Sequence, residues 1–533
     1  MKTKLIIVLL FTSCFLLDAH AGSATWKWDP ADNNWNNPAN WVEGTVPNGP
    51  SDTATFNTSN APNVTIQSSI ELGQIVFDDD ASTFTIALQP QKMLTLDGSG
   101  VINNSALTQN LVLQADASGD FGTEGVIMLE NAATTGSNTV YTLNGGMHEF
   151  RGQGGTIYFD GSSSASDSTF ILEGGTIDGA GGGLIFFYDT STGAEATFMV
   201  EGGTVASARG GDVGFGGVGG KSTAGTATVI ATGGTVAGAS GGTISFFDVA
   251  PSEPTLIATG EANGGNPPYI YFDQNVPGNL ARVQLFGNGL LDISNSFNTT
   301  VGSLEGDGMV DLGDFTLTVG GNNQSTAFSG LIEDVTSEGS QGTIKKVGTG
   351  TLRLSDANTF RRGIVTLEGT VVIENQTGSG SGPGSVTVQA GTLAGKGIIA
   401  GPTTIGTGGG PGAFLAPGAA SKQPRTLTLQ KAITFKGDAT YTYKLNTKKA
   451  KADQVVANSV TIETGAQFDL NTVGSRKLTT GKVFTAINNT ATTPISGTFA
   501  NLPDDATVTV GRNAFQTDYQ GGDGNDLTLT VVQ

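Results

Sequence analysis

Four aspartates recur at corresponding places in a repeated phrase, and their type and spacing could support chemistry. Each follows a short run of aromatic and β-branched residues, and they are Asp160, Asp189, Asp248 and Asp273. If successive copies stack as neighbouring strands ~4.8 Å apart, two carboxylates would approach the separation found in retaining glycoside hydrolases. A polysaccharide hydrolase or lyase is therefore one hypothesis for the function.

A structural role explains the same aspartates more simply. Aspartate favours turns because its side chain hydrogen-bonds the nearby backbone, and a turn residue is copied whenever its repeat is copied. An active site, in contrast, interrupts a repeat. The copy Val213-Gly214-Phe215-Gly216 lacks the aspartate altogether. We therefore predict that the four aspartates are turn residues and that the protein is not an enzyme and has no catalytic residues.

Other reactive groups are scarce. Cys14 is the only cysteine, and His148 is the only histidine after residue 21. Because Cys14 falls in a segment that we expect to be removed, the mature chain has no thiolate chemistry and no multi-histidine metal centre. As the base of a catalytic triad, His148 would need a serine and a carboxylate that nothing marks. We predict a turn residue at His148, and neither a cofactor nor a metal site.

Three glycine-rich stretches resemble ligand loops. Gly521–Asp526 resembles one calcium-binding nonapeptide, but such a site needs a second copy in the next turn, so we favour a tight turn and leave calcium binding open. Gly378–Gly384 and Gly408–Gly412 resemble phosphate cradles. Neither is followed by a helix or by Lys-Ser/Thr, so we predict loops between coils.

The aspartates belong to a repeat that runs from about residue 139 to 287. Its clearest copy is Thr169-Phe170-Ile171-Leu172-Glu173-Gly174-Gly175-Thr176. The lead threonines are 30, 28, 31 and 27 residues apart, at Thr139, Thr169, Thr197, Thr228 and Thr255. Strand-forming residues separated by Gly-Gly turns at unequal spacing indicate constant strands and variable loops.

One such unit cannot bury its own apolar face, so neighbouring units must stack around a shared core. We predict an all-β fold, a right-handed parallel β-helix with a cap at each end. The alternative is a long antiparallel β-sandwich array, which would need more even hairpin spacing. Alternate residues of each strand should face the core. The larger apolar volume places these residues inside: Phe170, Leu172, Phe198, Val200, Val229 and Leu256.

The N-terminal segment and the composition indicate where the protein is located. Residues 1–21 resemble a secretory signal peptide, with an apolar run after Lys4 and a small-residue cleavage site at Ala19-His20-Ala21. A lipoprotein with its lipid on Cys14 is the alternative, although the residues before Cys14 fit that pattern poorly. The remaining 512 residues carry 24 lysines and arginines against 46 aspartates and glutamates. This acidity disfavours nucleic acid and anionic membranes as partners. We predict a secreted or extracellular protein without a membrane span.

The two ends of a solenoid must be covered. All four tryptophans lie near the N-terminus, at Trp26, Trp28, Trp35 and Trp41. Large rings cover an open end well, so we favour a cap over the alternative, a sugar-stacking platform. From about residue 431 the sequence is more polar. Its lysine cluster, Lys448, Lys449 and Lys451, fits a solvated run that protects an edge; contact with an anionic partner is the alternative.

Two parts of the sequence resemble bacterial proteins with autotransporter-associated β-strand repeats. One is Thr25-Trp26 through Asn40-Trp41, followed by Pro47, Asp52 and Phe56; the other is Ile344–Phe360, with its Lys346 and Gly348-Thr349-Gly350-Thr351-Leu352. The resemblance covers about 22–60 and 341–533. It implies an exported parallel β-helix passenger that is often displayed at the cell surface. Autotransporters end in a membrane β-barrel, for which the sequence has no room before Gln533. The resemblance therefore supports the fold and export more than surface attachment.

Five segments follow from these patterns. They are a signal peptide (1–21), an N-terminal cap with the first coils (22–100), a glycine-rich β-helix (101–340), the resembling repeat coils (341–430) and a C-terminal β cap (431–533). The function expected is that of a secreted, non-enzymatic, structural or adhesin-like protein of the cell surface or extracellular matrix. Its partner would be a surface or matrix component, with polysaccharide as the candidate class.

Overall fold

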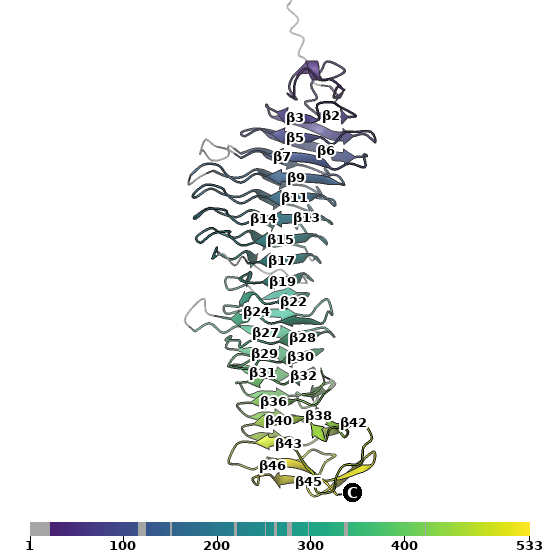
Figure 1. Cartoon of the computed structure of the whole chain (residues 1–533), viewed down its shortest axis with the longest axis vertical. Helices are drawn as coiled ribbons and strands as arrows, with labels where there is room; N and C mark the ends of the chain where they lie inside the picture. Colours follow the sequence, from purple (N-terminus) through teal and green to yellow (C-terminus); the bar gives the residue numbers. More distant parts are fainter. Residues whose placement is uncertain are drawn as a thin grey trace, which may run out of the picture.

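The part of the chain that the structure describes begins after the predicted signal peptide, which lies outside it. The structure is a computed structural model, and the described residues are 22–115, 124–149, 152–217, 221–250, 252–260, 264–273, 280–296, 298–334, 339–419, 421 and 423–532. These residues wind into a tall stack of β-coils (Figure 1). One short 3-10 helix, η1 (Pro38–Asn40), interrupts the strands near the N-terminus.

Sheet 1 occupies one side of the stack from its N-terminal end to its middle. Its strands pair in coil order, each parallel to the next. They are β1 (Ala24–Thr25), β2 (Gly49–Phe56), β4 (Ile70–Phe77), β6 (Met93–Asn103), β8 (Val126–Leu129), β10 (Thr156–Phe159), β12 (Leu184–Phe187), β14 (Asp212–Gly216), β16 (Thr243–Phe247), β18 (Tyr269–Asp273), β20 (Leu290–Asp292), β23 (Met309–Asp311) and β26 (Leu331–Glu333).

Sheet 2 runs through almost the whole stack, and its successive coils also pair in parallel. Its strands are β3 (Asn63–Ile66), β5 (Thr85–Leu88), β7 (Gln109–Leu113), β9 (Thr139–Leu143), β11 (Thr169–Leu172), β13 (Thr197–Val200), β15 (Thr228–Thr232), β17 (Thr255–Thr259), β19 (Arg282–Phe286), β22 (Ser303–Gly306), β25 (Thr326–Phe328), β28 (Thr351–Leu354), β30 (Thr370–Ile373), β32 (Gly391–Gly395), β35 (Ala413–Leu415), β38 (Ala439–Asn446) and β42 (Gln467–Val473). A short strand, β39 (Lys451–Ala452), pairs antiparallel with β38.

Two further sheets complete the C-terminal half. Sheet 3 is parallel and contains β21 (Thr299–Val301), β24 (Thr316–Val319), β27 (Thr343–Lys346), β29 (Gly363–Thr366), β31 (Ser385–Val388), β34 (Thr403–Ile405), β37 (Ile433–Phe435) and β41 (Val460–Ile462). Sheet 4 contains β33 (Ile398–Ile399), β36 (Thr426–Leu429), β40 (Gln454–Ala457), β43 (Val483–Asn489), β46 (Asp526–Val531), β45 (Asn513–Gly521) and β44 (Thr507–Val510). Its last four strands are antiparallel.

This pairing confirms the predicted parallel β-helix, and the alternative of an antiparallel array is wrong. Five strands of sheet 2 begin at the lead threonines of the repeat, from Thr139 to Thr255. The register is constant from Thr169 onwards although the loops differ in length, because Thr169 pairs with Thr197, Thr197 with Thr228 and Thr228 with Thr255. Thr139 is one residue out of step, since Thr169 pairs with Val140. Constant strands with variable loops are therefore what the sequence pattern encodes.

The core consists of aromatic and aliphatic side chains stacked from coil to coil. On sheet 2, the rings of Tyr141, Phe170 and Phe198 stack at centroid distances of 5.0 and 4.9 Å. On sheet 1, five phenylalanines stack at 4.3 to 5.3 Å: Phe159, Phe187, Phe215, Phe246 and Phe272. The six residues predicted to face inward are all fully buried: Phe170, Leu172, Phe198, Val200, Val229 and Leu256. The neighbouring Thr169 and Thr197 are partly exposed, so the predicted strand faces are correct.

The Gly-Gly turns exist because successive coils approach each other closely there. A Cβ atom placed on Gly174 would lie 2.1 Å from the carbonyl oxygen of Gly202. A Cβ on Gly202 would lie equally close, 2.1 Å, to the carbonyl oxygen of Gly233. Real side chains do not tolerate such a distance, so the turn stack requires residues without a Cβ.

The tryptophan-rich segment covers the N-terminal end, as predicted. Trp26, Trp35 and Trp41 are buried and pack against Phe56, with ring centroids 4.9 to 6.1 Å apart. Trp41 donates its indole N–H to the carbonyl oxygen of Trp35 at 2.8 Å. Trp28 alone is exposed. Three of the four rings are therefore core, which leaves no sugar-stacking platform of several tryptophans.

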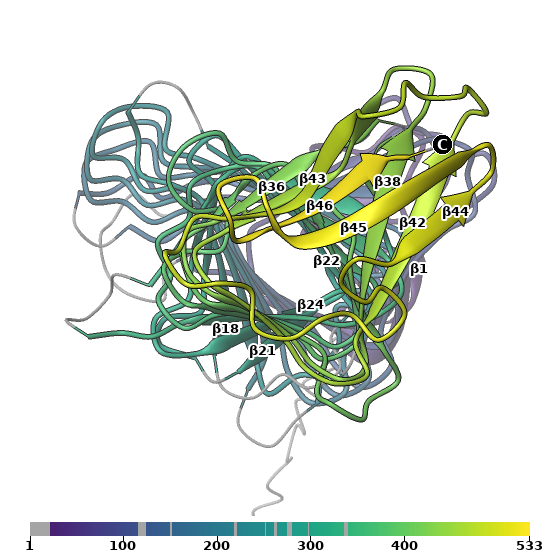
Figure 2. The ribbon, with the colours of Figure 1, turned by 90° about the horizontal axis from the view of Figure 1, so that it is seen from below.

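The antiparallel strands of sheet 4 close the other end. Viewed from below, β45 and β46 cross the open end of the coil (Figure 2). Lys448 and Lys449 are exposed between β38 and β39, and the exposed Lys451 begins β39. The run is therefore solvated, and its edge-protecting role stays a prediction. The chain thus forms one continuous solenoid with a cap at each end.

The stack makes a rod whose length can be measured. Parallel strands lie ~4.8 Å apart, so the coils of sheet 2 and the two caps should give the mature chain a length of roughly 75–95 Å. Small-angle X-ray scattering should return a rod-like distance distribution that ends in this range. A compact, nearly spherical particle would contradict the solenoid.

Candidate functional site

The four repeated aspartates do not form one ladder of carboxylates. Phe159 pairs with Phe187, which places Asp160 opposite Tyr188 and not opposite Asp189. Phe247 pairs with Asp273, so Asp248 lies one residue past the position opposite Asp273. Successive coils therefore do not present these aspartates at the same register position, and the carboxylate pair required by the hydrolase hypothesis is missing from this line.

Three of the four aspartates, Asp160, Asp189 and Asp248, lie in turns. The predicted turn role is wrong for Asp273, which is the last residue of strand β18 and pairs with Phe247. Asp189 and Asp248 have φ angles of 50° and 47°, in the left-handed region where aspartate and asparagine are tolerated better than most residues. The Oδ1 atom of Asp160 accepts a hydrogen bond from Gly161 N at 2.8 Å. This geometry agrees with the predicted turn role.

A pair of substitutions at Asp189 tests that role. Asp189→Asn should change the free energy of unfolding by less than about 0.5 kcal/mol, because asparagine also adopts the left-handed conformation. Asp189→Ala should cost about 1 kcal/mol, because a Cβ without a local hydrogen-bonding group is strained there. Urea unfolding of both variants measures the difference. Equal losses for both would point to a role of the carboxylate charge.

His148 and the glycine loops agree with their structural interpretations. His148 lies in a turn, with its Nδ1 2.8 Å from the carbonyl oxygen of Glu149. Gly521–Asp526 is a turn between β45 and β46 in which Gly524 N donates to Gly521 O at 2.9 Å. No group of three or more metal-ligating side chains occurs within the described ranges.

The Gly408–Gly412 loop already holds an anion of its own chain. The carboxylate of Asp438 accepts hydrogen bonds from the backbone N–H groups of Thr407, Gly408 and Gly410, at 2.6 to 3.2 Å. Asp438 is slightly buried, which opposes its ionisation, but these N–H groups hold its pKa below the ordinary value. The loop is an anion-binding nest filled by an internal carboxylate, so it does not present a phosphate site.

The lysine of the resembling repeat is also structural. Lys346 is buried, and its Nζ donates to the carbonyl oxygens of Val347, Gly348 and Glu368 at 2.6, 2.7 and 3.4 Å. Burial lowers the pKa of Lys346 to about 8. All three ammonium hydrogens are used within the coil, so this cation is not available to a ligand.

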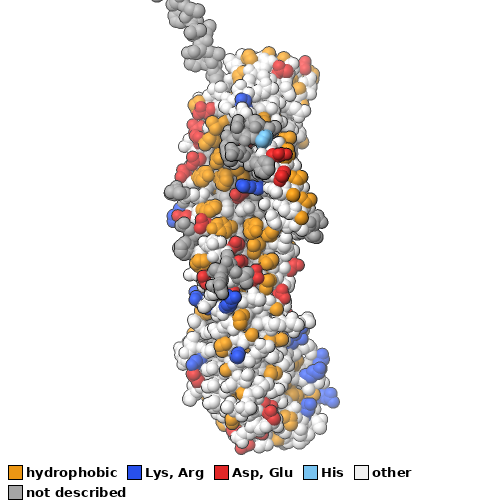
Figure 3. All heavy atoms as spheres, turned by 90° about the vertical axis from the view of Figure 1, so that its left-hand side faces the viewer, with side chains coloured by type: hydrophobic (Ala, Val, Ile, Leu, Met, Phe, Trp, Pro, Cys, Tyr) orange, Lys and Arg blue, Asp and Glu red, His pale blue; other side chains and the backbone are white. Residues whose placement is uncertain are grey.

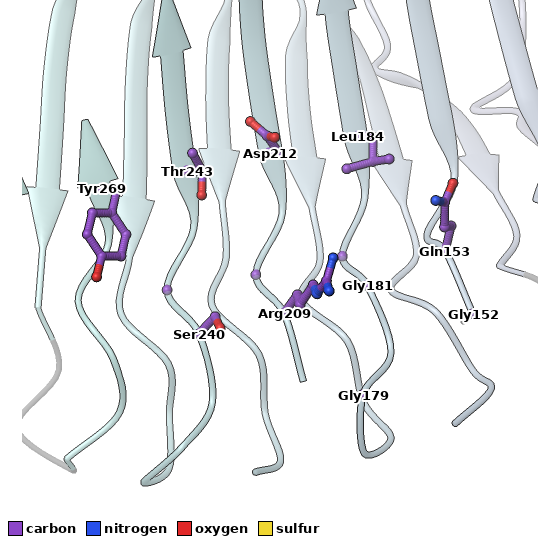
Figure 4. Close-up of a pocket in the computed structure, with 13 residues that line it drawn as sticks. Gly152, Gln153, Gly179, Gly181, Leu184, Arg209, Asp212, Ser240, Thr243 and Tyr269 are labelled. Atoms are coloured by element: carbon purple, nitrogen blue, oxygen red, sulfur yellow. The ribbon is translucent and has the colours of Figure 1, made fainter. Parts of the chain in front are cut away.

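A groove on sheet 1 is the most site-like feature of the described surface. The first residues of four consecutive strands, β12 to β18, line one wall: Leu184, Asp212, Thr243 and Tyr269. Loops that precede the strands supply the opposite wall with Gln153, Arg209 and Ser240 (Figure 4). The groove has a volume of about 470 Å³.

Glycines keep the floor of this groove open. Gly152, Gly179, Gly181, Gly182, Gly210 and Gly241 line it, and the coils touch closely at several of them. A Cβ on Gly182 would lie 2.4 Å from Gly211 N, and one on Gly210 would lie 2.3 Å from Gly241 O. The coil contact that excludes side chains from the floor therefore also creates the space above it.

Asp212 is the unusual residue of the groove. It starts β14, and its Oδ1 atom is buried without a hydrogen-bond partner. Burial raises the pKa of Asp212 to about 6, and a hydrogen bond with the Ser245 hydroxyl opposes this increase only in part. A carboxylate with one buried, unpartnered oxygen lowers the stability of the fold at neutral pH, and such a residue is a candidate functional residue.

The pH dependence of stability tests this description. Between about pH 4 and pH 6 the folded state retains the Asp212 proton that the unfolded state loses, so the contribution of Asp212 to stability falls as pH rises through this window. Asp212→Asn removes the buried charge and should raise the free energy of unfolding at pH 7, with a smaller gain at pH 4. Urea melts at both pH values measure this. The exposed Asp167 offers a control, Asp167→Asn, which should change stability little; an equal gain there would contradict the assignment.

Exposed aromatic rings flank the groove on the outer face of sheet 1. Tyr158, Phe186 and Tyr188 form a triangle, with ring centroids 6.0, 6.2 and 6.3 Å apart and interplanar angles of 18° to 22°. Further along the axis, on β16 and β18, Phe247 and Tyr271 form a second pair at 6.4 Å. Tyr188 and Phe247 are 37% and 36% exposed, although rings of this size are usually more deeply buried.

Small residues separate the two ring clusters. Phe186, Gly214, Ser245 and Tyr271 occupy one register position on four successive strands. A Cβ on Gly214 would lie 3.0 Å from the Phe186 ring, and one on Gly217 would lie 2.8 Å from the Tyr188 ring. The rings therefore lean over glycines, and the face dips between the clusters above Asp212.

The sequence contained part of this signal. The alternation in Ile157-Tyr158-Phe159 already assigns Tyr158 to the face opposite the buried pair, and the same holds for Phe186. Arg209 and Ser240 carry a different signal, because they take the same place in a repeated Ala-x-Gly-Gly phrase that begins at Ala180, Ala208 and Ala239. The repeat copy Val213-Gly214-Phe215-Gly216 lacks the aspartate that follows the other copies, and Asp212 lies directly before it.

The charge of the rod is uneven along its length. Residues 22–281 contain five lysines and arginines against 26 aspartates and glutamates, whereas residues 282–533 contain 19 against 20. Figure 3 shows the same trend on one side of the rod, with acidic side chains mainly on the upper and middle parts and more basic side chains below. The groove belongs to the acidic half. Within the described residues no helix has the length and apolarity to cross a membrane.

Comparisons with known proteins leave the family open. No family model matches the sequence, and no curated protein sequence is similar to it. Among solved structures, the crystal structure of the Haemophilus influenzae Hap adhesin matches with 12% identity over 90% of this chain and a TM-score of 0.29. This chain spans 64% of the length of that chain. The resemblance to autotransporter-associated repeats therefore stays a prediction, and the fold assignment depends on the strand pairing described above.

Proposed function

We propose that this protein is a secreted, non-enzymatic, structural or adhesin-like β-helix of the cell surface or extracellular matrix. The observation that carries the proposal is the groove of Asp212 beside a line of exposed and partly exposed rings on one face of a long, regular rod. Outward positions of a β-helix are free to bind, because alternate residues already fill the core.

Two properties of the face support a binding role. Exposed, contiguous apolar side chains in a soluble protein mark interaction surfaces, and the groove between the rings adds polar groups for orientation. The coils beneath are fixed by stacked rings and parallel ladders, so the ring positions require no rearrangement on binding. A rod with such a face suits attachment to an extended partner.

Export is supported by the sequence of residues 1–21. The positive start, apolar run and small-residue cleavage site are those of a secretory signal. Fractionation of producing cells, followed by detection of the mature chain, should place it outside the cytoplasm. Retention of the full-length precursor in the cytoplasm would contradict this part of the proposal.

Binding is tested with the mature chain itself. Fluorescently labelled protein should bind saturably to the envelope or matrix of the producing cells. The double variant Tyr188→Ala, Asp212→Asn should bind at least tenfold more weakly. Phe286→Ala provides a matched control, because Phe286 is equally exposed, at 39%, but lies on sheet 2. Absence of saturable binding, or equal loss with the control, would overturn the proposal.

A polysaccharide hydrolase or lyase is the second candidate, and one observation favours it. The raised pKa of Asp212, about 6, is in the range that a general acid needs. However, a glycosidase uses two carboxylates, and Asp212 is the one carboxylate among the described residues that line the groove. The test is whether purified protein releases reducing or unsaturated sugar ends from polysaccharides. If it does, and if Asp212→Asn abolishes the release, the enzyme becomes the better-supported function.

A further inference from the structure

The ring line and the groove run side by side along the axis of the rod. The groove is lined by the first residues of β12 to β18, and the rings lie two to four residues further along the strands, from Tyr158 on β10 to Tyr271 on β18. The five consecutive strands β10 to β18 span about 19 Å at ~4.8 Å per step. A linear ligand along the axis would thus meet the rings on one flank and the polar groove on the other.

The groove offers both hydrogen-bond donors and acceptors. Arg209 is exposed and makes no salt bridge with any described residue, and Asp212 brings a half-buried carboxylate to the groove. Thr243, Ser240 and Tyr269 add hydroxyl groups that can donate or accept. Burial raises the pKa values of Tyr158 and Tyr188, so these phenols stay neutral and can also donate.

Mixed donors and acceptors beside aromatic faces match the chemistry of a sugar chain. Each sugar presents several hydroxyl groups that both donate and accept, and its C–H faces are apolar enough to pack on aromatic rings. A purely apolar ligand would leave Asp212 and Arg209 unpaired at a cost of about 1–3 kcal/mol for each buried group. Ring platforms alone would not explain the half-buried carboxylate in the groove beside them.

Other classes of ligand fit less well. A peptide that adds a strand needs an open sheet edge, and β10 to β18 are each paired on both sides. Nucleic acids and acidic polysaccharides would be repelled by this half of the rod, whose residues 22–281 carry a net charge of −21. A neutral chain avoids that repulsion.

We propose that the outer face of sheet 1 from β10 to β18 binds a neutral polysaccharide, which lies along the axis of the rod. Tyr158, Phe186 and Tyr188 stack against sugar rings at one end of this face, and Phe247 and Tyr271 do so at the other end. Asp212 and Arg209 hydrogen-bond the sugar hydroxyl groups from the adjoining groove. This assignment rests on the proposed binding function and gives it a ligand class.

Affinity electrophoresis tests the assignment without any activity measurement. The acidic mature chain migrates in native gels, and a polysaccharide that it binds retards it when cast into the gel. The probes are neutral glucans, mannans and galactans, with pectate and alginate as acidic counterparts. We expect retardation by at least one neutral polymer and by neither acidic polymer. Phe186→Ala, Tyr188→Ala and Asp212→Asn should each weaken binding about tenfold or more.

Two controls show whether a loss of binding comes from the substituted site or from a disturbed fold. Further outcomes distinguish a wrong ligand class from a wrong proposed function. Phe286→Ala should leave retardation unchanged, and each variant should keep the far-ultraviolet circular dichroism of the parent. Retardation that survives all three face variants would overturn the site. Retardation by no neutral polymer, while labelled protein still binds to matrix, would overturn the ligand class but not the proposed function. Concentration-dependent dimerisation in sedimentation that Tyr188→Ala abolishes would instead make this face a contact between two copies.

Discussion

Phe198→Ala should destabilise the β-helix by about 3–5 kcal/mol, the range for deletion of a large aromatic side chain from a packed core. The Phe198 ring is fully buried and stacks on Phe170 at 4.9 Å. It also meets Phe187 and Phe215 edge-on, at 5.8 and 6.1 Å. Removing the ring would delete its stacking contact within sheet 2 and also its contacts with the phenylalanines of sheet 1. Because the strands on both sides are held by hydrogen-bonded pairing, the structure can collapse into the resulting cavity only to a limited extent.

The adjacent residue supplies the control. Thr197 lies on the same strand but on its outer face, so Thr197→Ala should change the free energy of unfolding by less than about 1 kcal/mol. Urea unfolding of the two variants compares them directly. Equal midpoints, or a less stable Thr197 variant, would mean that the two faces of this strand are reversed.

Gly202→Ala should also destabilise strongly, by about 3 kcal/mol, although it adds a single methyl group. A Cβ at Gly202 would lie 2.1 Å from Gly233 O and 2.4 Å from Gly233 C. Relief requires neighbouring coils to separate, and such a shift breaks hydrogen bonds in the adjoining parallel ladders. The cost is that of overpacking against backbone, which cannot rotate away as a side chain can.

A control substitution at a second glycine tests whether the loss of stability comes from the close contact between coils or from replacing any glycine with alanine. Gly409 lies in the Asp438 loop, and a Cβ there would have no atom within 4 Å. Gly409→Ala should therefore stay within about 0.5 kcal/mol of the parent protein. Thermal or urea unfolding of both variants measures the contrast. A neutral Gly202 variant would show that the coils can separate at little cost.

The repeat was predictable because a β-helix is specified locally. Lead threonines at intervals of 27 to 31 residues marked the starts of sheet 2 strands, and alternation assigned Phe198 to the core. The tryptophans were predictable as a cap, since large apolar rings near the end of a solenoid have an open coil to cover. Each inference needed only the neighbouring repeat, and in a solenoid each coil contacts only its neighbours.

The repeated aspartates show where local patterns mislead. In the sequence Asp160 and Asp189 occupy equivalent places, yet in the structure Asp160 lies opposite Tyr188. One extra residue in the run before Asp189 is enough to shift the register of the turn. The sequence favoured turns for these residues, but the disposition of the carboxylates depended on inter-coil pairing.

By itself, the sequence determined the coil period, the strands, the residues of the core and the position of the N-terminal cap, because these follow from alternation and repetition within about thirty residues. Only the tertiary structure decided where the groove lies. Arg209 and Ser240 reach it from the loops before β14 and β16, and Asp212 becomes half-buried because the coils on either side cover it. Solvation and hydrogen-bond partners depend on neighbouring coils, so neither the burial of Asp212 nor its raised pKa could be read from its place in the chain.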